Sequence, residues 1–323
     1  MSLPTKSLNI FMQELLDYAG LYPPTNLTLQ ESLDNFSNYY FHKQKDWLGN
    51  FILPVNKIDE TILILKEQNT FQKLNNKACF SIIISTCENI SEYSNILEND
   101  ILLIKKLIHK FENKIIIESI ELFPPKEIFK SNNSNKTIDI LNILKDKFSG
   151  IKSIKQLYCE IPFIENMNQY VEQISNFNAH YSNKFAVKLR TGGVTPAQIP
   201  PAIQIAKAIR ICAEQKVPVK ATAGLHVPVP NDNRHVGARL HGFLNIFSCF
   251  LLCYDNLMSI EKMEKIILDY SYSNFKFTEN GLCIEDNFIS NEKMTELRKS
   301  FIKSFGTCSF LEPIDHLIEN HIL

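Results

Sequence analysis

The sequence predicts an α/β protein, a (β/α)8 TIM-like barrel with a helical C-terminal extension. Eight short runs rich in β-branched residues alternate with amphipathic segments, as repeated β-α units around a parallel sheet do. The length of 323 residues suits one such barrel. A doubly wound open sheet is the less favoured alternative, because the chain has only ten glycines and neither G-x-G-x-x-G nor G-x-x-x-x-G-K-[ST].

The eight predicted strands are apolar runs that end at polar residues, proline or glycine. They occupy residues 15–24, 50–55, 79–86, 114–123, 156–163, 184–193, 217–226 and 241–249. Amphipathic helices are predicted over residues 29–44, 98–112, 136–148, 166–181 and 200–215. The last of these begins at Pro200 and Pro201, where a missing backbone N–H costs little.

The domain organisation follows from the same pattern. We expect residues 1–255 to form the (β/α)8-like barrel and residues 256–323 to form a helical C-terminal extension packed on it. Segments such as "SIEKMEKIILDYS" and "SNEKMTELRKSFIKSF" have helical character, and "ENGLCIEDN" is expected as a hairpin or loop between them.

Composition narrows the classes of partner. Hydrophobic residues make up 45% of the chain, charged residues 21%, and the net charge is −1. Such a balance argues against nucleic acid and acidic membrane surfaces as partners. The N-terminal sequence has no long apolar run and no stretch is long enough to span a bilayer, so we expect a cytoplasmic protein. Eight cysteines without a C-x-x-C motif are expected to be reduced.

Two lysines stand near the ends of neighbouring predicted strands. In "FAVKLRTGG" Lys188 and Arg190 share one strand face, and in "VPVKATAGLH" Lys220 shares a face with Thr222. In a barrel the loops after the strands carry the chemistry, so these side chains are expected at the barrel mouth.

Other polar residues fall at comparable places. The fourth strand offers Glu118, and the fifth offers Glu160 with Tyr158 beside it. The remaining candidates are predicted to bind substrate: Asp17, Thr191, Gly192, Gly193, Gly224, His226, His241 and Asn245, together with Arg190 and Thr222.

A metal site is not predicted. His226, His235 and His241 are separated by nine and six residues, which matches no compact zinc pattern. Cys308 and Ser309 could act as nucleophiles, but no neighbour in the sequence activates them.

Two lysines, Lys188 and Lys220, at the mouth of the same barrel suggest imine chemistry. A second ammonium or burial favours the neutral amine, which can attack a carbonyl and form a Schiff base. A carboxylate, Glu160 or Glu118, could move the protons. The alternatives are an isomerase or epimerase in which Lys188, Arg190 and Lys220 clamp a phosphate or carboxylate, and a non-catalytic binding barrel. No cofactor is expected. The expected partner is a small molecule, either a neutral or an anionic one, and homo-oligomer formation stays open.

The segments "VKLRTGG" and "VPVKATAGLH" resemble the strand pair of deoxyribose-phosphate aldolase-type class I aldolases. The resemblance covers residues 184–226 and implies that Lys188 forms the imine while Lys220 lowers its pKa. Arg190 has no counterpart in that motif. Over its whole length the chain is similar to a bacterial TIM-barrel family without an assigned activity, through "DYAGLYPP", "KLRTGG", "KATAGLH", "HGFLN" and "FGTCSFLEPIDHL". Members of that family often carry a second histidine where this chain has Val227.

Overall fold

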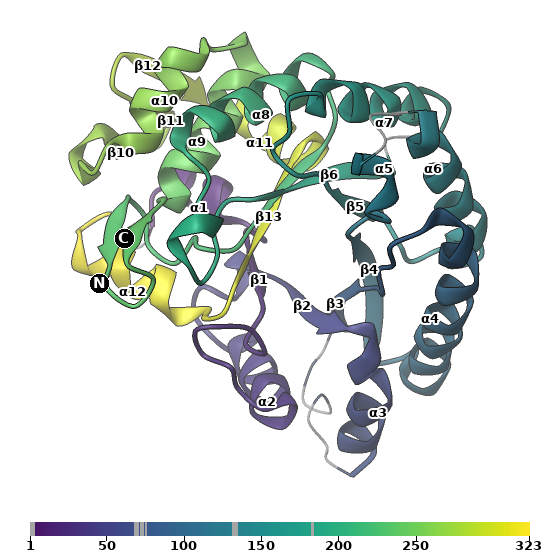
Figure 1. Cartoon of the computed structure of the whole chain (residues 1–323). Helices are drawn as coiled ribbons and strands as arrows, with labels where there is room; N and C mark the ends of the chain where they lie inside the picture. Colours follow the sequence, from purple (N-terminus) through teal and green to yellow (C-terminus); the bar gives the residue numbers. More distant parts are fainter. Residues whose placement is uncertain (1–3, 68–70, 72–73, 75, 131–134, 182–183) are drawn as a thin grey trace. The chain divides into compact units, whose positions relative to one another are not determined.

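A computed structural model describes residues 4–67, 71, 74, 76–130, 135–181 and 184–323. Eight strands form a closed barrel in the order β1-β13-β7-β6-β5-β4-β3-β2 (Figure 1). Their bounds are β1 Leu16–Tyr18, β2 Leu48–Pro54, β3 Ala78–Ile83, β4 Ile115–Leu122, β5 Gln156–Glu160, β6 Phe185–Arg190, β7 Val219–Thr222 and β13 Ile302–Thr307. The predicted α/β barrel is therefore confirmed.

Helices separate most of these strands. Those between β1 and β7 are α2 Leu29–Tyr39, α3 Ile58–Glu67, α4 Ile90–Phe111, α5 Glu127–Lys130, α6 Asn135–Phe148, α7 Met167–Tyr181 and α8 Ala202–Glu214. The others are α1 Lys6–Met12, α9 Phe243–Asn256, α10 Ile260–Leu268, α11 Asn291–Ser300 and α12 Leu311–Glu319. The start of α2 follows from its sequence: Thr28 and Glu31 form a capping box that satisfies two terminal N–H groups.

The prediction of the eighth strand was wrong. Residues 243–256 form helix α9, and the eighth barrel strand is β13, at residues 302–307. Eleven residues of α9 are buried, from Phe243 to Cys253, so this part of the helix is buried on every side. An apolar run of this kind does not show whether it is a buried strand or a buried helix.

The segment after residue 255 is more than a helical extension. It contains β13 and an antiparallel sheet of β10 Phe275–Phe277, β11 Gly281–Ile284 and β12 Asn287–Ser290. The barrel thus does not end at residue 255. A second small hairpin, β8 Asn231–Asn233 with β9 Ala238–Leu240, lies between β7 and α9. At the other end of the chain, β1 covers only three residues of the predicted 15–24.

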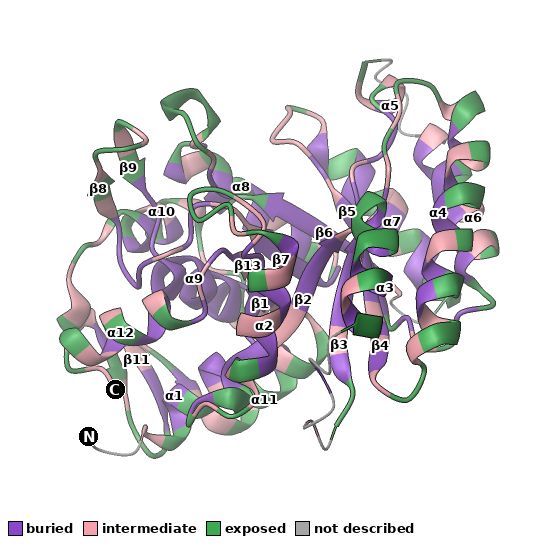
Figure 2. Ribbon diagram, turned by 90° about the horizontal axis from the view of Figure 1, so that it is seen from below, coloured by how far each residue is buried: buried purple, intermediate pink, exposed green. Residues whose placement is uncertain are grey.

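The chain divides into two compact units. The terminal unit comprises Met1–Asp17, Asp46–Gly49 and Leu189–Leu323, and the central unit comprises Tyr18–Lys45 and Asn50–Lys188. In the central unit α4, α6 and α7 lie outside β4 and β5 (Figure 1). Helices α4 and α6 turn exposed faces outward while the strands are largely buried (Figure 2). Its core includes an aromatic group of Tyr18, Phe36, Phe51 and Phe80.

The core of the terminal unit packs strand against helix. Phe305 of β13 stacks on Phe243 of α9, at 5.4 Å between ring centroids, and also contacts Phe247. Phe247 in turn meets Phe11 of α1. Within the described residues, no helix is both long enough and apolar enough to cross a membrane.

Candidate functional site

Lys188 lies in a buried ion cluster of the central unit. Its Nζ is 3.0 Å from Glu121 Oε2 and 3.0 Å from Glu160 Oε2. The side chains of Lys188 and Glu121 are only 8% and 2% exposed. Glu160 is opposite Lys188 in the register of β5 and β6, so the two side chains lie on the same face of the sheet. Buried charges require such partners, because an isolated ion loses its hydration.

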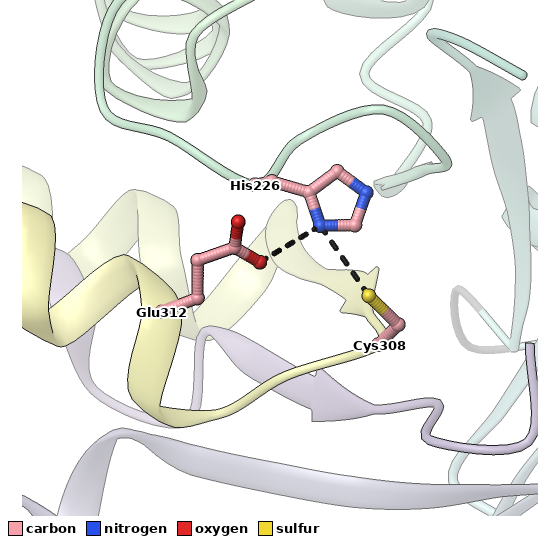
Figure 3. A group of neighbouring side chains, drawn as sticks. All are labelled: His226, Cys308 and Glu312. Atoms are coloured by element: carbon pink, nitrogen blue, oxygen red, sulfur yellow. Dashed lines mark hydrogen bonds and ion pairs between the residues drawn. The ribbon is translucent and has the colours of Figure 1, made fainter. Parts of the chain in front are cut away.

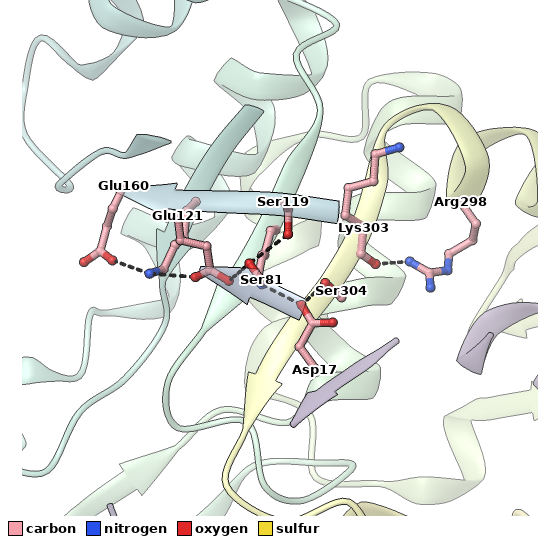
Figure 4. Close-up of polar contacts among 10 residues, drawn as sticks. Asp17, Ser81, Ser119, Glu121, Glu160, Arg298, Lys303 and Ser304 are labelled. Carbon is pink, nitrogen blue, oxygen red and sulfur yellow. Dashed lines mark hydrogen bonds and ion pairs between the residues drawn. The ribbon is translucent and has the colours of Figure 1, made fainter. Parts of the chain in front are cut away.

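Two serines extend this cluster. Ser81 of β3 donates a hydrogen bond to Glu121 Oε1 at 2.9 Å, and Ser119 of β4 donates to Ser81 at 2.7 Å (Figure 4). Ser81 and Ser119 are paired in register, and Glu121 lies two residues further along the same face of β4. We call Lys188, Glu121, Glu160, Ser81 and Ser119 the Lys188 cluster. It combines an amine, two carboxylates and a hydroxyl chain.

Glu118 does not belong to this cluster. Its carboxylate pairs with Lys155 at 2.5 Å, and the Lys155 side chain is 71% exposed. Because Glu118 is three residues from Glu121, the two side chains point to opposite faces of β4. The register also shifts here, so that Ser119 rather than Glu118 lies opposite Ser81. The structure therefore places Glu121, and not Glu118, beside Lys188.

Tyr22, from the loop after β1, is another neighbour that the sequence did not indicate. Burial raises the pKa of its phenol, the charge of Glu121 raises it further, and Lys188 opposes this. The phenol thus stays protonated and can donate a hydrogen bond next to the two charged groups.

Lys220 lies in a second buried cluster, in the terminal unit. Its Nζ is 2.5 Å from Asp17 Oδ2, and the two side chains are 0% and 1% exposed. Ser304 of β13 donates a hydrogen bond to the same oxygen at 2.5 Å (Figure 4). We call Lys220, Asp17 and Ser304 the Lys220 cluster. Asp17 was predicted as a candidate, whereas Ser304 was missed because β13 was not recognised as a strand.

Gly49 makes room for Asp17. A Cβ at this position would lie 2.2 Å from Asp17 Oδ1, far inside van der Waals contact. The glycine therefore allows the carboxylate to lie against the β2 backbone.

The two glycine turns after β6 and β7 interlock. Thr191 donates from its backbone N–H to Thr222 O at 2.8 Å and from Oγ1 to Ala223 O at 2.9 Å. A Cβ on Gly192 would lie 2.8 Å from Gly224 Cα, and Gly224 has φ +76°. Both glycines are thus required by backbone packing, which is a structural role for residues predicted to bind substrate.

Arg190 and Gly193 occupy the outer part of this region. Arg190 is the last residue of β6, and its exposed side chain has no hydrogen bond or ion pair with the described residues. A Cβ on Gly193 would lie 2.4 Å from Gln198 Oε1, which accepts a hydrogen bond from Val194 N–H at 2.8 Å. Arg190 is therefore the cation of this turn that remains available to an anion.

His241 and Asn245 have structural partners. His241 Nε2 donates to Pro200 O at 2.8 Å, and burial lowers the pKa of its imidazole. Asn245 donates from Nδ2 to Ile266 O at 2.6 Å and to Asp269 O at 2.8 Å. These bonds tie the start of α9 to the start of α8 and to the end of α10, and they assign no substrate contact to either residue.

His226 does not join the other histidines. Its Nδ1 is 3.5 Å from Cys308 Sγ and 3.3 Å from Glu312 Oε2 (Figure 3). His235 lies in the exposed turn between β8 and β9. We call His226, Cys308 and Glu312 the His226 cluster. Burial opposes protonation of its imidazole, but hydrogen bonds to Cys308 and Glu312 outweigh it and raise the pKa to about 10. The structure thus places an imidazole beside Cys308, from a residue 82 positions away in the sequence.

No protein-family model matches the chain, and no curated protein matches its sequence.

Proposed function

We propose that the protein is a class I aldolase-like lyase that acts on a small carbonyl compound through a Schiff base at Lys188. The Lys188 cluster carries this proposal, because it places a buried amine 3.0 Å from each of two carboxylates. The likeness of residues 184–226 to class I aldolases agrees with it.

The chemistry assigns a task to each group. In the resting protein two carboxylates stabilise the ammonium form of Lys188, so the amine first passes a proton to one of them. It then attacks the substrate carbonyl, and the resulting carbinolamine loses water to give the iminium, with the carboxyl group donating the proton.

Cleavage follows from the iminium. The bond between the α and β carbons breaks, its electron pair moves toward the iminium nitrogen, and a carboxylate accepts the proton of the β-hydroxyl group. The enamine is then protonated at carbon, and water releases the second product and the free lysine. No further reactant is needed.

Trapping the imine tests the proposal. The protein is incubated with small aldehydes, ketones and sugar phosphates, reduced with borohydride, and mapped by peptide mass. Burial also lowers the pKa of Lys184, and it lowers the pKa of Lys303 to about 8. Labelling of these two lysines measures non-specific reactivity. An adduct at Lys188 in excess of both supports the proposal, and adducts at Lys184 and Lys303 with Lys188 unlabelled refute it.

A matched pair of variants tests the carboxylate. Glu121→Gln removes the carboxylate beside Lys188 and should slow trapping about 100-fold, the ordinary contribution of a general acid or base. Glu118→Gln, on the same strand but paired with Lys155, should leave the rate unchanged. Equal rates in the two variants would show that Glu121 takes no part.

A second candidate is an isomerase that binds an anionic substrate without an imine. It is favoured by Arg190, an exposed guanidinium at the end of β6 without a carboxylate partner among the described residues. Inorganic phosphate should then bind to the wild type and fail to bind to Arg190→Ala, with no reducible adduct at Lys188.

A further inference from the structure

The His226 cluster is independent of both lysine clusters. His226 follows β7, Cys308 follows β13, and Glu312 lies in the first turn of α12. Strands β7 and β13 are parallel neighbours, with Gly306 opposite Thr222, so His226 and Cys308 leave the barrel at the same end of adjacent strands. The topology therefore brings the three side chains together, although 82 residues separate His226 from Cys308.

From the geometry we infer that His226, Cys308 and Glu312 bind a zinc-type divalent cation. Their ligand atoms, Nδ1, Sγ and a carboxylate oxygen, all lie within 4.8 Å of one another. Thiolate, imidazole and carboxylate are the ligands that proteins use for Zn²⁺. One thiolate and one carboxylate also neutralise the two positive charges of the ion.

Two of the three separations match those around a tetrahedral ion, and the third is no more than 4.8 Å. Bond lengths of about 2.3 Å to sulfur and about 2.0–2.2 Å to nitrogen or oxygen place tetrahedral ligand atoms about 3.4–3.6 Å apart. The structure has 3.5 Å between Nδ1 and Sγ and 3.3 Å between Nδ1 and Glu312 Oε2 (Figure 3). Two of the three ligand separations are thus already within about 0.2 Å of the values that zinc requires.

Without an ion, the Nδ1–H of His226 is shared between the sulfur and the carboxylate, and a bound cation would replace this proton. An imidazole nitrogen carries either one N–H or one lone pair, so Nδ1 can make one well-directed bond. Here both a thiol and a carboxylate approach the same nitrogen (Figure 3). A cation between the three atoms satisfies all of them at once.

The backbone supporting these ligands is fixed by local bonds. Thr307 Oγ1 donates to Ser309 O at 2.8 Å, and Ser309 Oγ accepts from Glu312 N–H at 3.1 Å. Cys308 is buried, whereas the Glu312 side chain is 40% exposed. Three protein ligands leave a fourth position for water or for a substrate oxygen, which is the arrangement of catalytic rather than structural zinc sites.

Metal titration of the full chain tests the inference. The purified protein is stripped with a chelator, and Zn²⁺ binding is measured by competition with a chromophoric chelator. Wild type should bind one ion per chain. Cys308→Ser and Glu312→Gln should each weaken binding at least about 10-fold, while Cys283→Ser and His235→Gln, outside the cluster, should bind as wild type does.

Co²⁺ provides a readout of the ligand itself. A thiolate bound to Co²⁺ gives a sulfur-to-metal charge-transfer absorbance, which should appear in wild type and in Cys283→Ser but not in Cys308→Ser. Glu312→Gln changes a partly exposed side chain and should leave the circular dichroism of the metal-free protein unchanged, so its weaker binding is not a folding defect. Zn²⁺ binding of equal strength in wild type, Cys308→Ser and Glu312→Gln would overturn the inference, as would absence of binding in wild type. Neither result bears on an imine at Lys188.

Discussion

Replacing Asp17 by asparagine should destabilise the protein severely. The amide has nearly the shape of the carboxylate, so packing is preserved and only the charge is lost. Lys220, which is fully buried, then loses the carboxylate that lies 2.5 Å from its Nζ. Removing one partner of a buried ion pair costs about 3–5 kcal/mol, because the remaining charge stays desolvated.

The cost can be measured as a change in melting temperature. At about 2 °C per kcal/mol for a chain of this size, Asp17→Asn should lower Tm by about 6–10 °C. The double variant Asp17→Asn/Lys220→Met removes both charges with little change in volume and should recover most of that loss.

Surface charge gives the reference for this experiment. Glu60→Gln breaks the ion pair between Glu60 and Lys57. Both side chains are about half exposed, so the free energy of unfolding should fall by no more than about 1 kcal/mol. The reasoning is refuted if Asp17→Asn melts like Glu60→Gln, or if the double variant is no more stable than Asp17→Asn.

Three further predictions concern stability. Gly49→Ala places a methyl group against Asp17 and should lower the free energy of unfolding, measured with denaturant, by about 1–3 kcal/mol. In the control Gly150→Ala no atom lies within 4 Å of the new Cβ, so no steric clash should lower the free energy of unfolding. Thr28→Ala removes the capping box of α2 and should cost about 1 kcal/mol in the same assay. Burial lowers the pKa of Lys303 to about 8, so between this value and the usual value of 10.5 the unfolded chain binds more protons than the folded one. Stability should therefore rise with pH across that window, and a Tm-against-pH curve of Lys303→Met should lack this rise.

Much of the architecture can be predicted from the sequence, because hydrophobic residues recur with different periods in strands and in helices. Amphipathic helices such as α4 and α7 bury one face and expose the other, so their hydrophobic residues recur with the period of a helix and predict it. Helix α9 buries all its faces and has no such pattern, so its apolar run is compatible with a strand as well as a helix. Strand β13 was missed since "IKSFGT" is short and only partly apolar.

The site was predicted in part for similar reasons. The pairing of Lys188 with Glu160 follows from the alternation of side chains along two neighbouring parallel strands, which puts both residues on the same face of the sheet. Glu121 could have been found too, because Ser119 shares its face of β4 and marks that face as polar. The contact of His226 with Cys308 depends on which strand closes the barrel, a long-range fact that local patterns do not contain.

The division of the chain into two units has a consequence for synthesis on the ribosome. The central unit ends at Lys188 and is complete in the chain well before translation finishes. The terminal unit instead needs both ends of the polypeptide. Asp17 is synthesised early, and Ser304, its hydrogen-bond partner, is synthesised 287 residues later. A buried acidic side chain thus remains without its serine partner until the last strand emerges, and a chaperone that shields the early N-terminal segment would act during this interval.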